Sequence, residues 1–220
     1  ERSGAVAPDR GWVPRHLTID GDDGLRAAML LYEKDHSWGE FVFDWSWANA
    51  YEQAGLSYYP KLVSAVPFTP ATNRRLLLAD DKDDTAADAL VSAAIQLAAR
   101  SDCSSVHLLF PAEQELQRLE ESGLKVRKDC QFHWRNRDYA DFDEFLGTFT
   151  ASKRKKARRD RRRVSEAGIR FRRLKGADLD LPTWEQVYQL ISITFMQRGS
   201  LPYFTLDFFR QISDALPDGI

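Results

Sequence analysis

The sequence predicts an α/β fold in which helices pack on a mixed β-sheet, and two observations carry this prediction. Across the first 136 residues, apolar segments of strand length alternate with segments of helical periodicity, which is typical of a layered sheet-and-helix structure. The 220 residues are 43% hydrophobic and 12% aromatic, so the chain can bury a sizeable core. A change of composition near Arg137 divides it into a first domain, residues 1–136, and a second unit, residues 137–220.

The first predicted elements are a β-hairpin, a short helix and two strands. Residues 12–20 and 25–33 are apolar-rich and are joined by Gly-Asp-Asp-Gly, which tolerates a tight turn. A helix at 47–56 ends near Gly55, and strands follow at 58–68 and 74–80. In this aromatic-rich part of the chain we expect Phe41, Phe43 and Phe68 to enter the core.

The rest of the first domain reads as helix, strand, helix and strand. Residues 85–100 are alanine-rich, with Leu90, Ala94 and Leu97 on one stripe and Thr85 as a candidate N-cap. A buried strand is predicted at 104–111, a helix at 112–123 that ends at Gly123, and a long strand at 124–136.

The second unit is predicted to be mainly helical. Helices at 139–149 and 152–167 precede a strand at 169–176. An amphipathic helix follows at 181–199, with Pro182 in its first turn, and a last helix at 205–216. Because residues 137–220 offer these two helices no sheet, we expect them to pack on the first domain or on another chain.

Charge is concentrated in the helix at 152–167. Lys153 to Arg163 contains nine of the 31 basic residues and one of the 33 acidic ones, so the remainder holds 22 bases and 32 acids. A cationic patch on an acidic body indicates one local anionic partner. A solvated charged helix without a partner is the alternative.

The spacing of the arginines favours phosphate binding. Arg154, Arg158 and Arg162 recur every four residues and share one face, beside a row that contains Lys155 and Arg159. Planar guanidinium groups donate paired hydrogen bonds to anions such as a diphosphate, a nucleotide sugar or an RNA backbone. No recognition-helix pattern accompanies them, so DNA is not an expected partner.

Other candidate site residues lie at a strand start and at the domain boundary. Tyr59 and Lys61 flank Pro60, and Lys61 could reach a phosphate or a carboxylate. His133, next to Trp134 and near Asn136, is either a proton carrier or hydrogen-bond anchor, or a structural histidine. The four histidines and two cysteines show no metal spacing, and no nucleophile motif marks a catalytic residue.

The compartment is inferred from what the chain lacks. It has no signal peptide and no apolar run near the roughly 20 residues that span a bilayer. We therefore expect a soluble, cytoplasmic protein with two ordinary thiols. The chain lacks an initiating Met, which is compatible with a sequence cut at its ends.

Three long segments, residues 36–70, 131–146 and 152–169, together resemble the FemAB-like group of the GNAT acyltransferase superfamily. These are bacterial proteins commonly labelled as peptidoglycan-biosynthesis or GNAT-type N-acyltransferases. The resemblance runs from about Gly11 to Gly176 and continues more weakly to the end.

The resemblance implies two tandem GNAT-like domains, the first nearly complete in residues 1–136 and the second only begun in residues 137–220. It implies amide-bond formation, with acyl-CoA or aminoacyl-tRNA as donor and an anionic cell-wall precursor as acceptor. The precursor's phosphates would contact Arg154, Arg158, Arg159 and Arg162, with Lys61 on the opposing face. Residues 66–81 lack the glycines with which GNAT enzymes cradle the coenzyme A pyrophosphate, so the resemblance does not extend to that loop.

Two rival hypotheses remain open. A binding module could use the basic helix to follow the phosphates of RNA or tRNA, with a steep dependence of affinity on salt. An inactive scaffold could recruit cell-wall or lipid-linked partners, although the helix lacks the apolar face of a membrane-surface helix.

Overall fold

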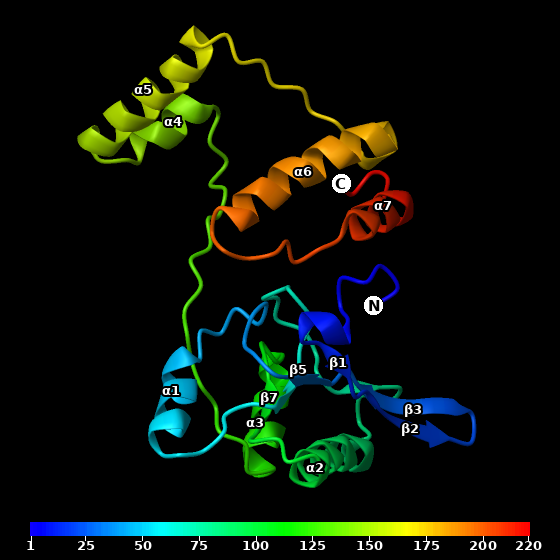
Figure 1. The fold of residues 1–220 in the computed structure, drawn as a ribbon. Helices are drawn as coiled ribbons and strands as arrows, with labels where there is room; N and C mark the ends of the chain where they lie inside the picture. Colours follow the sequence, from blue (N-terminus) through cyan, green and yellow to red (C-terminus); the bar gives the residue numbers. More distant parts are fainter.

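The computed structural model describes residues 1–220 and shows the predicted alternation of strands and helices in the first part of the chain (Figure 1). The strands are β1 (Val13–Pro14), β2 (Leu17–Gly21), β3 (Gly24–Met29), β4 (Tyr32–Lys34), β5 (Lys61–Ser64), β6 (Leu77–Leu78) and β7 (Val106–Leu108). The α-helices are α1 (Trp45–Gln53), α2 (Asp84–Arg100), α3 (Glu113–Glu121), α4 (Phe142–Gly147), α5 (Ala151–Glu166), α6 (Leu181–Met196) and α7 (Leu206–Ala215). Single 3-10 turns lie at Pro8–Arg10 and Gly176–Asp178. The predicted mixed α/β class is therefore confirmed.

The strands form two sheets. The larger has the order β1-β4-β5-β7, in which β5 and β7 are parallel and the other pairs antiparallel. The smaller has the order β2-β3-β6 and is antiparallel throughout. The predicted hairpin is present as β2 and β3, but each of its apolar segments continues into the other sheet, as β1 and β4. This split places β4 beside β5, where the candidate site lies.

Helix α2 carries much of the core. Its buried face includes Leu90 and Ala94 of the predicted stripe, packed on β2, β3 and the larger sheet. The N-cap is Asp83, whose side chain accepts a hydrogen bond from the Ala86 N–H (3.0 Å). The prediction of Thr85 as cap is wrong, because the helix begins at Asp84 and Thr85 lies within its first turn. Arg26 also donates a hydrogen bond to the Asp83 carboxylate.

Two predicted strands are absent. Residues 124–136 and 169–176 form no β-ladder, and Phe132 in the first segment is 99% exposed. Figure 1 shows the first segment as an extended connection that leaves α3 and leads to α4. A strand requires a partner strand as well as a suitable local sequence, and neither segment pairs with a strand.

Helices α4 and α5 form a hairpin that projects away from the sheets (Figure 1). Leu146 of α4 is buried, whereas α5 has no buried residue at all. Helix α5 ends before Gly168, which adopts a left-handed backbone conformation (φ 66°) that glycine tolerates. The basic helix is thus present at nearly its predicted bounds.

Helices α6 and α7 pack on each other, with the rings of Trp184 and Phe209 stacked at 5.3 Å between centroids. The segment between them contacts the N-terminal part of the chain, where Tyr203 stacks on Phe68 at 5.2 Å between ring centroids. Arg10 also donates to the Pro202 carbonyl (3.0 Å). These helices were expected to pack on residues 1–136 or on another chain, and the structure shows contacts with residues 1–136. None of the seven helices combines the length and the apolar character that crossing a bilayer requires.

Candidate functional site

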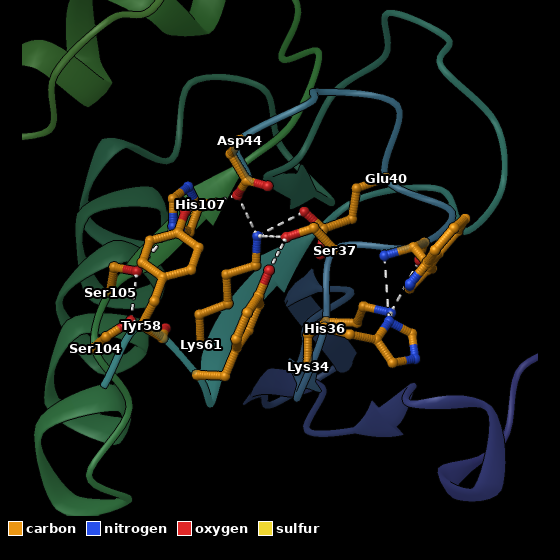
Figure 2. Close-up of polar contacts among 12 residues, drawn as sticks. Lys34, His36, Ser37, Glu40, Asp44, Tyr58, Lys61, Ser104, Ser105 and His107 are labelled. Carbon is orange, nitrogen blue, oxygen red and sulfur yellow. Dashed lines mark hydrogen bonds and ion pairs between the residues drawn. The ribbon is translucent and has the colours of Figure 1, made fainter. Parts of the chain in front are cut away.

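The first candidate site is built around a buried lysine. Lys61 opens β5, which is paired on both sides, and its side chain is 0% exposed. The ammonium group donates to Glu40 Oε2 (2.7 Å) and Asp44 Oδ2 (2.5 Å), and to Ser37 Oγ (2.9 Å) (Figure 2). Lys61 thus contacts carboxylates, one of its two predicted partners, but they belong to the same chain.

Two tyrosines complete this arrangement, which we call the Lys61 network (Ser37, Glu40, Asp44, Tyr58, Tyr59 and Lys61). The Tyr58 hydroxyl donates to Asp44 Oδ2 (2.6 Å). The Tyr59 hydroxyl lies 2.8 Å from Ser37 Oγ. The structure therefore brings two predicted site residues, Tyr59 and Lys61, together through a serine that the sequence did not single out.

The two carboxylates of the network differ in proton affinity. Burial alone would raise the pKa of Asp44, but hydrogen bonds from donors that include Lys61 and Tyr58 outweigh burial and lower the pKa to about 2. Burial raises the pKa of Glu40, and its ion pair with Lys61 only partly opposes this. Glu40 Oε1 and Asp44 Oδ1 are buried without a hydrogen-bond partner. Burying a carboxylate oxygen without a hydrogen-bond partner costs free energy, so these two oxygens set the Lys61 network apart from a fully satisfied buried ion pair.

A second buried lysine lies opposite Lys61 on the neighbouring strand. Lys34 of β4 is 0% exposed, and its ammonium group contacts the Trp38 carbonyl (3.2 Å) and the face of the Trp12 ring (3.9 Å). Burial lowers its pKa to about 8. Both lysines therefore anchor the loop at 35–44 to the larger sheet. Lys34 does so through the Trp38 carbonyl, and Lys61 through two carboxylates.

His107 lies at the other end of the Lys61 network (Figure 2). Its ring is 6.2 Å from that of Tyr58, and its Nε2 is 2.8 Å from Ser105 Oγ. Burial, together with the charge of Lys61, lowers its pKa to about 4, so the ring is neutral at physiological pH. Sequence reasoning missed His107, for which the sequence offers no signal. It also missed Glu40 and Asp44, whose one available signal is their close spacing in a short loop.

An aromatic hollow of about 460 Å³ lies over the same loop. Its lining consists of Ser37, Trp38, Gly39, Phe41, Phe43, Trp45 and Tyr203. Phe43 is 68% exposed, so its prediction as a core residue is wrong, while Phe41 and Phe68 are half-buried. Phe41 and Phe43 have left-handed backbones (φ 61° and 48°), and this conformation removes the strand alternation that would have buried them.

The second candidate region is a hollow of about 440 Å³ at the start of α4. It is lined by Trp134, Asn136, Tyr139, Asp141, Phe142 and Phe145. Arg161 of α5 lies 4.2 Å from the centroid of the Phe142 ring. Trp134 and Asn136 are thus placed beside the basic helix, whereas His133 is exposed and contacts Gln131 (3.1 Å).

The predicted basic residues of α5 are largely open to solvent. Arg154 is half-buried and donates to the Phe149 carbonyl (3.0 Å). Arg158 pairs with Asp143 (3.0 Å), and Arg162 lies 3.6 Å from Glu166. Arg159 lies 3.5 Å from Asp160, and Lys155 is exposed. Figure 1 shows α5 well separated from β5, so the structure does not bring these residues together with Lys61.

Comparison with known proteins places this chain in a family. A family model for FemAB-like proteins, described by peptidoglycan biosynthesis and recognition, matches residues 1–220. The chain therefore belongs to the FemAB-like family, and the resemblance found in its sequence is confirmed. No curated protein and no solved structure matches the chain.

Proposed function

We propose that this chain is an acyl- or aminoacyltransferase that forms an amide bond on an anionic cell-wall precursor, and that α5 holds the phosphate groups of the precursor. The observation that carries the proposal is the exposed cationic row of α5 beside the aromatic hollow at Trp134 and Phe142. In a family concerned with peptidoglycan biosynthesis, that combination suits a phosphorylated precursor.

The row is available for a ligand. Arg158 and Arg162 pair only with exposed carboxylates, those of Asp143 and Glu166. Exposed ion pairs contribute at most about 1 kcal/mol, so a doubly charged phosphate can replace them. Lys155 and Arg159, on the neighbouring row, extend the cationic surface. Arg154 contributes less freely, because it already holds the carbonyl that precedes α5.

The proposal includes the tandem GNAT-like architecture, with residues 1–136 as the first domain and 137–220 as the beginning of a second. Support comes from the larger sheet, in which the parallel strands β5 and β7 are connected through α2. The extended segment at 124–136 then separates this part from the helices of the second unit.

The chemistry proposed is transfer from acyl-CoA or aminoacyl-tRNA. The acceptor amine attacks the carbonyl carbon and a C–N bond forms. The thioester or ester bond then breaks, and the departing sulfur of coenzyme A or hydroxyl oxygen of the tRNA takes up the proton that the amine loses. Holding the two reactants together supplies much of the rate of such reactions. Residues 66–81 contain no glycine, so we do not assign coenzyme A to that loop.

The test is a binding titration of the whole protein with a UDP-linked muropeptide, followed by a transfer assay with both donor classes. Arg158→Gln/Arg162→Gln should weaken binding at least about tenfold, because two charge-assisted contacts are lost. Arg172→Gln/Arg173→Gln removes the same charge from exposed arginines outside α5 and should leave affinity nearly unchanged.

Three outcomes would overturn the proposal. One is the absence of muropeptide binding, and another is equal weakening by the two double variants. The third is binding of bulk tRNA alone with a steep loss of affinity as salt rises, which would favour the RNA-binding module instead.

A further inference from the structure

Two extended segments flank the α4–α5 hairpin, and both expose large apolar side chains. Segment 124–136 leads into the hairpin and exposes Phe132 (99%) and Trp134 (66%). Segment 169–175 follows α5 and exposes Phe171 (85%). Neither segment pairs with a strand, so no sheet covers these side chains.

The exposed apolar side chains lie around the same part of the hairpin. Trp134 and Phe142 line one hollow at the start of α4, and the Phe142 ring lies against Arg161 of α5. Ile169, which is also exposed, donates from its backbone N–H to the Val164 carbonyl (3.3 Å), so its segment continues directly from the last turn of α5. Exposed apolar side chains that gather in one place mark a surface of contact with another molecule.

Basic residues surround these apolar side chains. Residues 124–175 contain 18 of the 31 bases of the chain and only 7 of its 33 acids. Nine of the 18 bases lie in α5, and the other nine lie outside it, mostly in the two segments. We call the share of the two segments the flanking surface: the basic residues of 124–136 and 169–175, together with Phe132, Trp134, Ile169 and Phe171.

The charge of the flanking surface calls for an anionic partner. Outside residues 124–175 the chain holds 13 bases and 26 acids, so a cationic region lies on an otherwise acidic molecule. The hairpin projects away from the sheets, which keeps this region apart from the acid-rich residues 1–123 (Figure 1). A second copy of the same surface would meet it with like charge and be repelled.

The mixture of charge and apolar surface fits a lipid bilayer with anionic headgroups. Lysine and arginine are attracted to such headgroups, and tryptophan and phenylalanine favour the boundary between headgroups and acyl chains. Helix α5 by itself has no apolar face for this boundary. The two flanking segments supply, beside α5, the exposed apolar side chains that the helix lacks.

RNA is the other polyanion that the charge would admit. Single-stranded RNA is held by aromatic rings that stack on its bases. Ile169 has no ring to offer a base, yet an aliphatic side chain inserts into a bilayer as readily as a ring does. The flanking surface therefore favours lipid over RNA.

We propose that the flanking surface docks peripherally on a bilayer that contains anionic lipids. The basic side chains of 124–136 and 169–175 contact the headgroups, and Phe132, Trp134, Ile169 and Phe171 enter the boundary beneath them. This docking goes beyond the proposed function, which concerns phosphates held by α5, and it does not depend on that function.

The test is co-sedimentation of the whole protein with vesicles of phosphatidylcholine, made with or without phosphatidylglycerol. Vesicles with phosphatidylglycerol should be bound at least about tenfold more tightly, because only they attract the basic side chains. Binding should shift tryptophan emission to shorter wavelengths as Trp134 leaves water. Trp134→Phe should remove most of this shift and leave the affinity nearly unchanged, since a ring remains at that position.

Variants locate the contact. Phe132→Ser/Phe171→Ser should weaken vesicle binding at least about tenfold, because two apolar side chains no longer enter the boundary. Phe132→Leu/Phe171→Leu should keep nearly the full affinity, because leucine is also apolar. Phe43→Ser/Trp47→Ser is the matched control, with two exposed aromatic residues changed outside the flanking surface, and it should bind as the unaltered protein does.

Several results would overturn the proposal: no binding to either kind of vesicle, equal binding to both, or equal weakening by the two serine variants. Displacement of the vesicles by inorganic phosphate at matched ionic strength would also overturn it, since it would indicate a site for single anions. Binding of bulk tRNA without binding of vesicles, weakened alike by the leucine and serine variants, would replace the bilayer by RNA.

The same variants separate this inference from the proposed function. Arg172→Gln/Arg173→Gln should weaken vesicle binding at least about fivefold, although it leaves muropeptide affinity nearly unchanged. Vesicle binding with these properties in a protein that binds no muropeptide would uphold the docking surface and overturn the proposed function. Muropeptide binding that depends on α5, in a protein that ignores vesicles, would do the reverse.

Discussion

Lys34 and Lys61 face each other on neighbouring strands, and both side chains are withdrawn from water, yet only Lys61 has carboxylates within ion-pair distance. A buried charge is tolerated when it is paired and hydrogen-bonded, and it is otherwise costly. The pKa of about 8 for Lys34 expresses that cost. The two lysines therefore form a natural pair for comparison.

Lys61→Met should lower the free energy of unfolding by about 3–5 kcal/mol, because it leaves the carboxylates of Glu40 and Asp44 buried without their cation. Lys34→Met, the matched control, should change it by no more than about 1 kcal/mol, since removing a poorly solvated charge offsets the lost contacts. Urea denaturation at pH 7 measures both. Equal losses would show that the ion pairs of Lys61 do not stabilise the fold.

Asp44 predicts a dependence of stability on pH. Its pKa falls from 3.8 in the unfolded chain to about 2 in the folded protein, so the folded state binds fewer protons in that interval. The stabilisation is complete above about pH 4 and disappears as pH falls through about 2, and it amounts to about 2 kcal/mol. The raised pKa of Glu40 acts in the opposite sense and gives stability as pH falls.

The measurement compares Asp44→Asn with the unaltered protein at several pH values between 2 and 6. This range covers the pKa of Asp44 in both the folded and the unfolded chain. The difference in unfolding free energy should be largest near pH 6 and shrink towards pH 2. A difference that stays constant across this range would mean that Asp44 does not titrate as described.

The sequence could predict Lys61 as a special residue but not its partners. Pro60 and the strand start drew attention to it, whereas Glu40 and Asp44 lie 21 and 17 residues earlier in an aromatic loop. Their approach depends on the pairing of β4 with β5 and on the left-handed turns of the loop. No local pattern in the sequence encodes either of these.

Helices were predicted more accurately than strands, for a physical reason. The bounds of α2, α5, α6 and α7 follow from local features such as an apolar stripe, Gly168 and Pro182. Strand-like patterns at 124–136 and 169–176 did not produce strands, because backbone partners are a property of the whole fold. The loss of one local feature, such as an N-cap, should therefore have a more predictable effect on the stability of a helix than a local change has on a strand.

Asp83→Ala should reduce the free energy of unfolding by about 1–2 kcal/mol, because it removes both the N-cap of α2 and the partner of Arg26. Thr85→Ala, in the exposed first turn of the same helix, should change it by less than about 0.5 kcal/mol. Thermal and urea unfolding of the two variants decide between the cap in the structure and the one expected from sequence. A greater loss in Thr85→Ala would contradict the structure.

The larger buried cluster of the molecule lies within residues 17–124, around α2 and the strands. The C-terminal helices join this body mainly through aromatic contacts, with Tyr203 packed between Phe68 and Phe195. Phe68 and Tyr203 are more than 130 positions apart along the chain, so local sequence patterns could not specify the docking.

Tyr203→Ala should loosen this docking without unfolding the sheets. Backbone amides of α6 and α7 should exchange with deuterium at least about tenfold faster, while those of α2 keep their rates. Leu201→Ala, at a 72% exposed position in the same segment, is the control and should leave both sets unchanged. Faster exchange in α2 as well would mean that the two parts unfold as one unit.

Helix α5 contributes no buried residue, and this has a consequence for how such a protein can change over generations. Substitutions on a helix that contributes nothing to the core hardly affect folding, so selection acts on them mainly through the ligands that the helix binds. The charge pattern of α5 can therefore change, or even reverse in sign, while the residues that form the sheets stay the same. A library randomised at its solvent-facing positions should yield mostly folded proteins with a wide spread of ligand preferences.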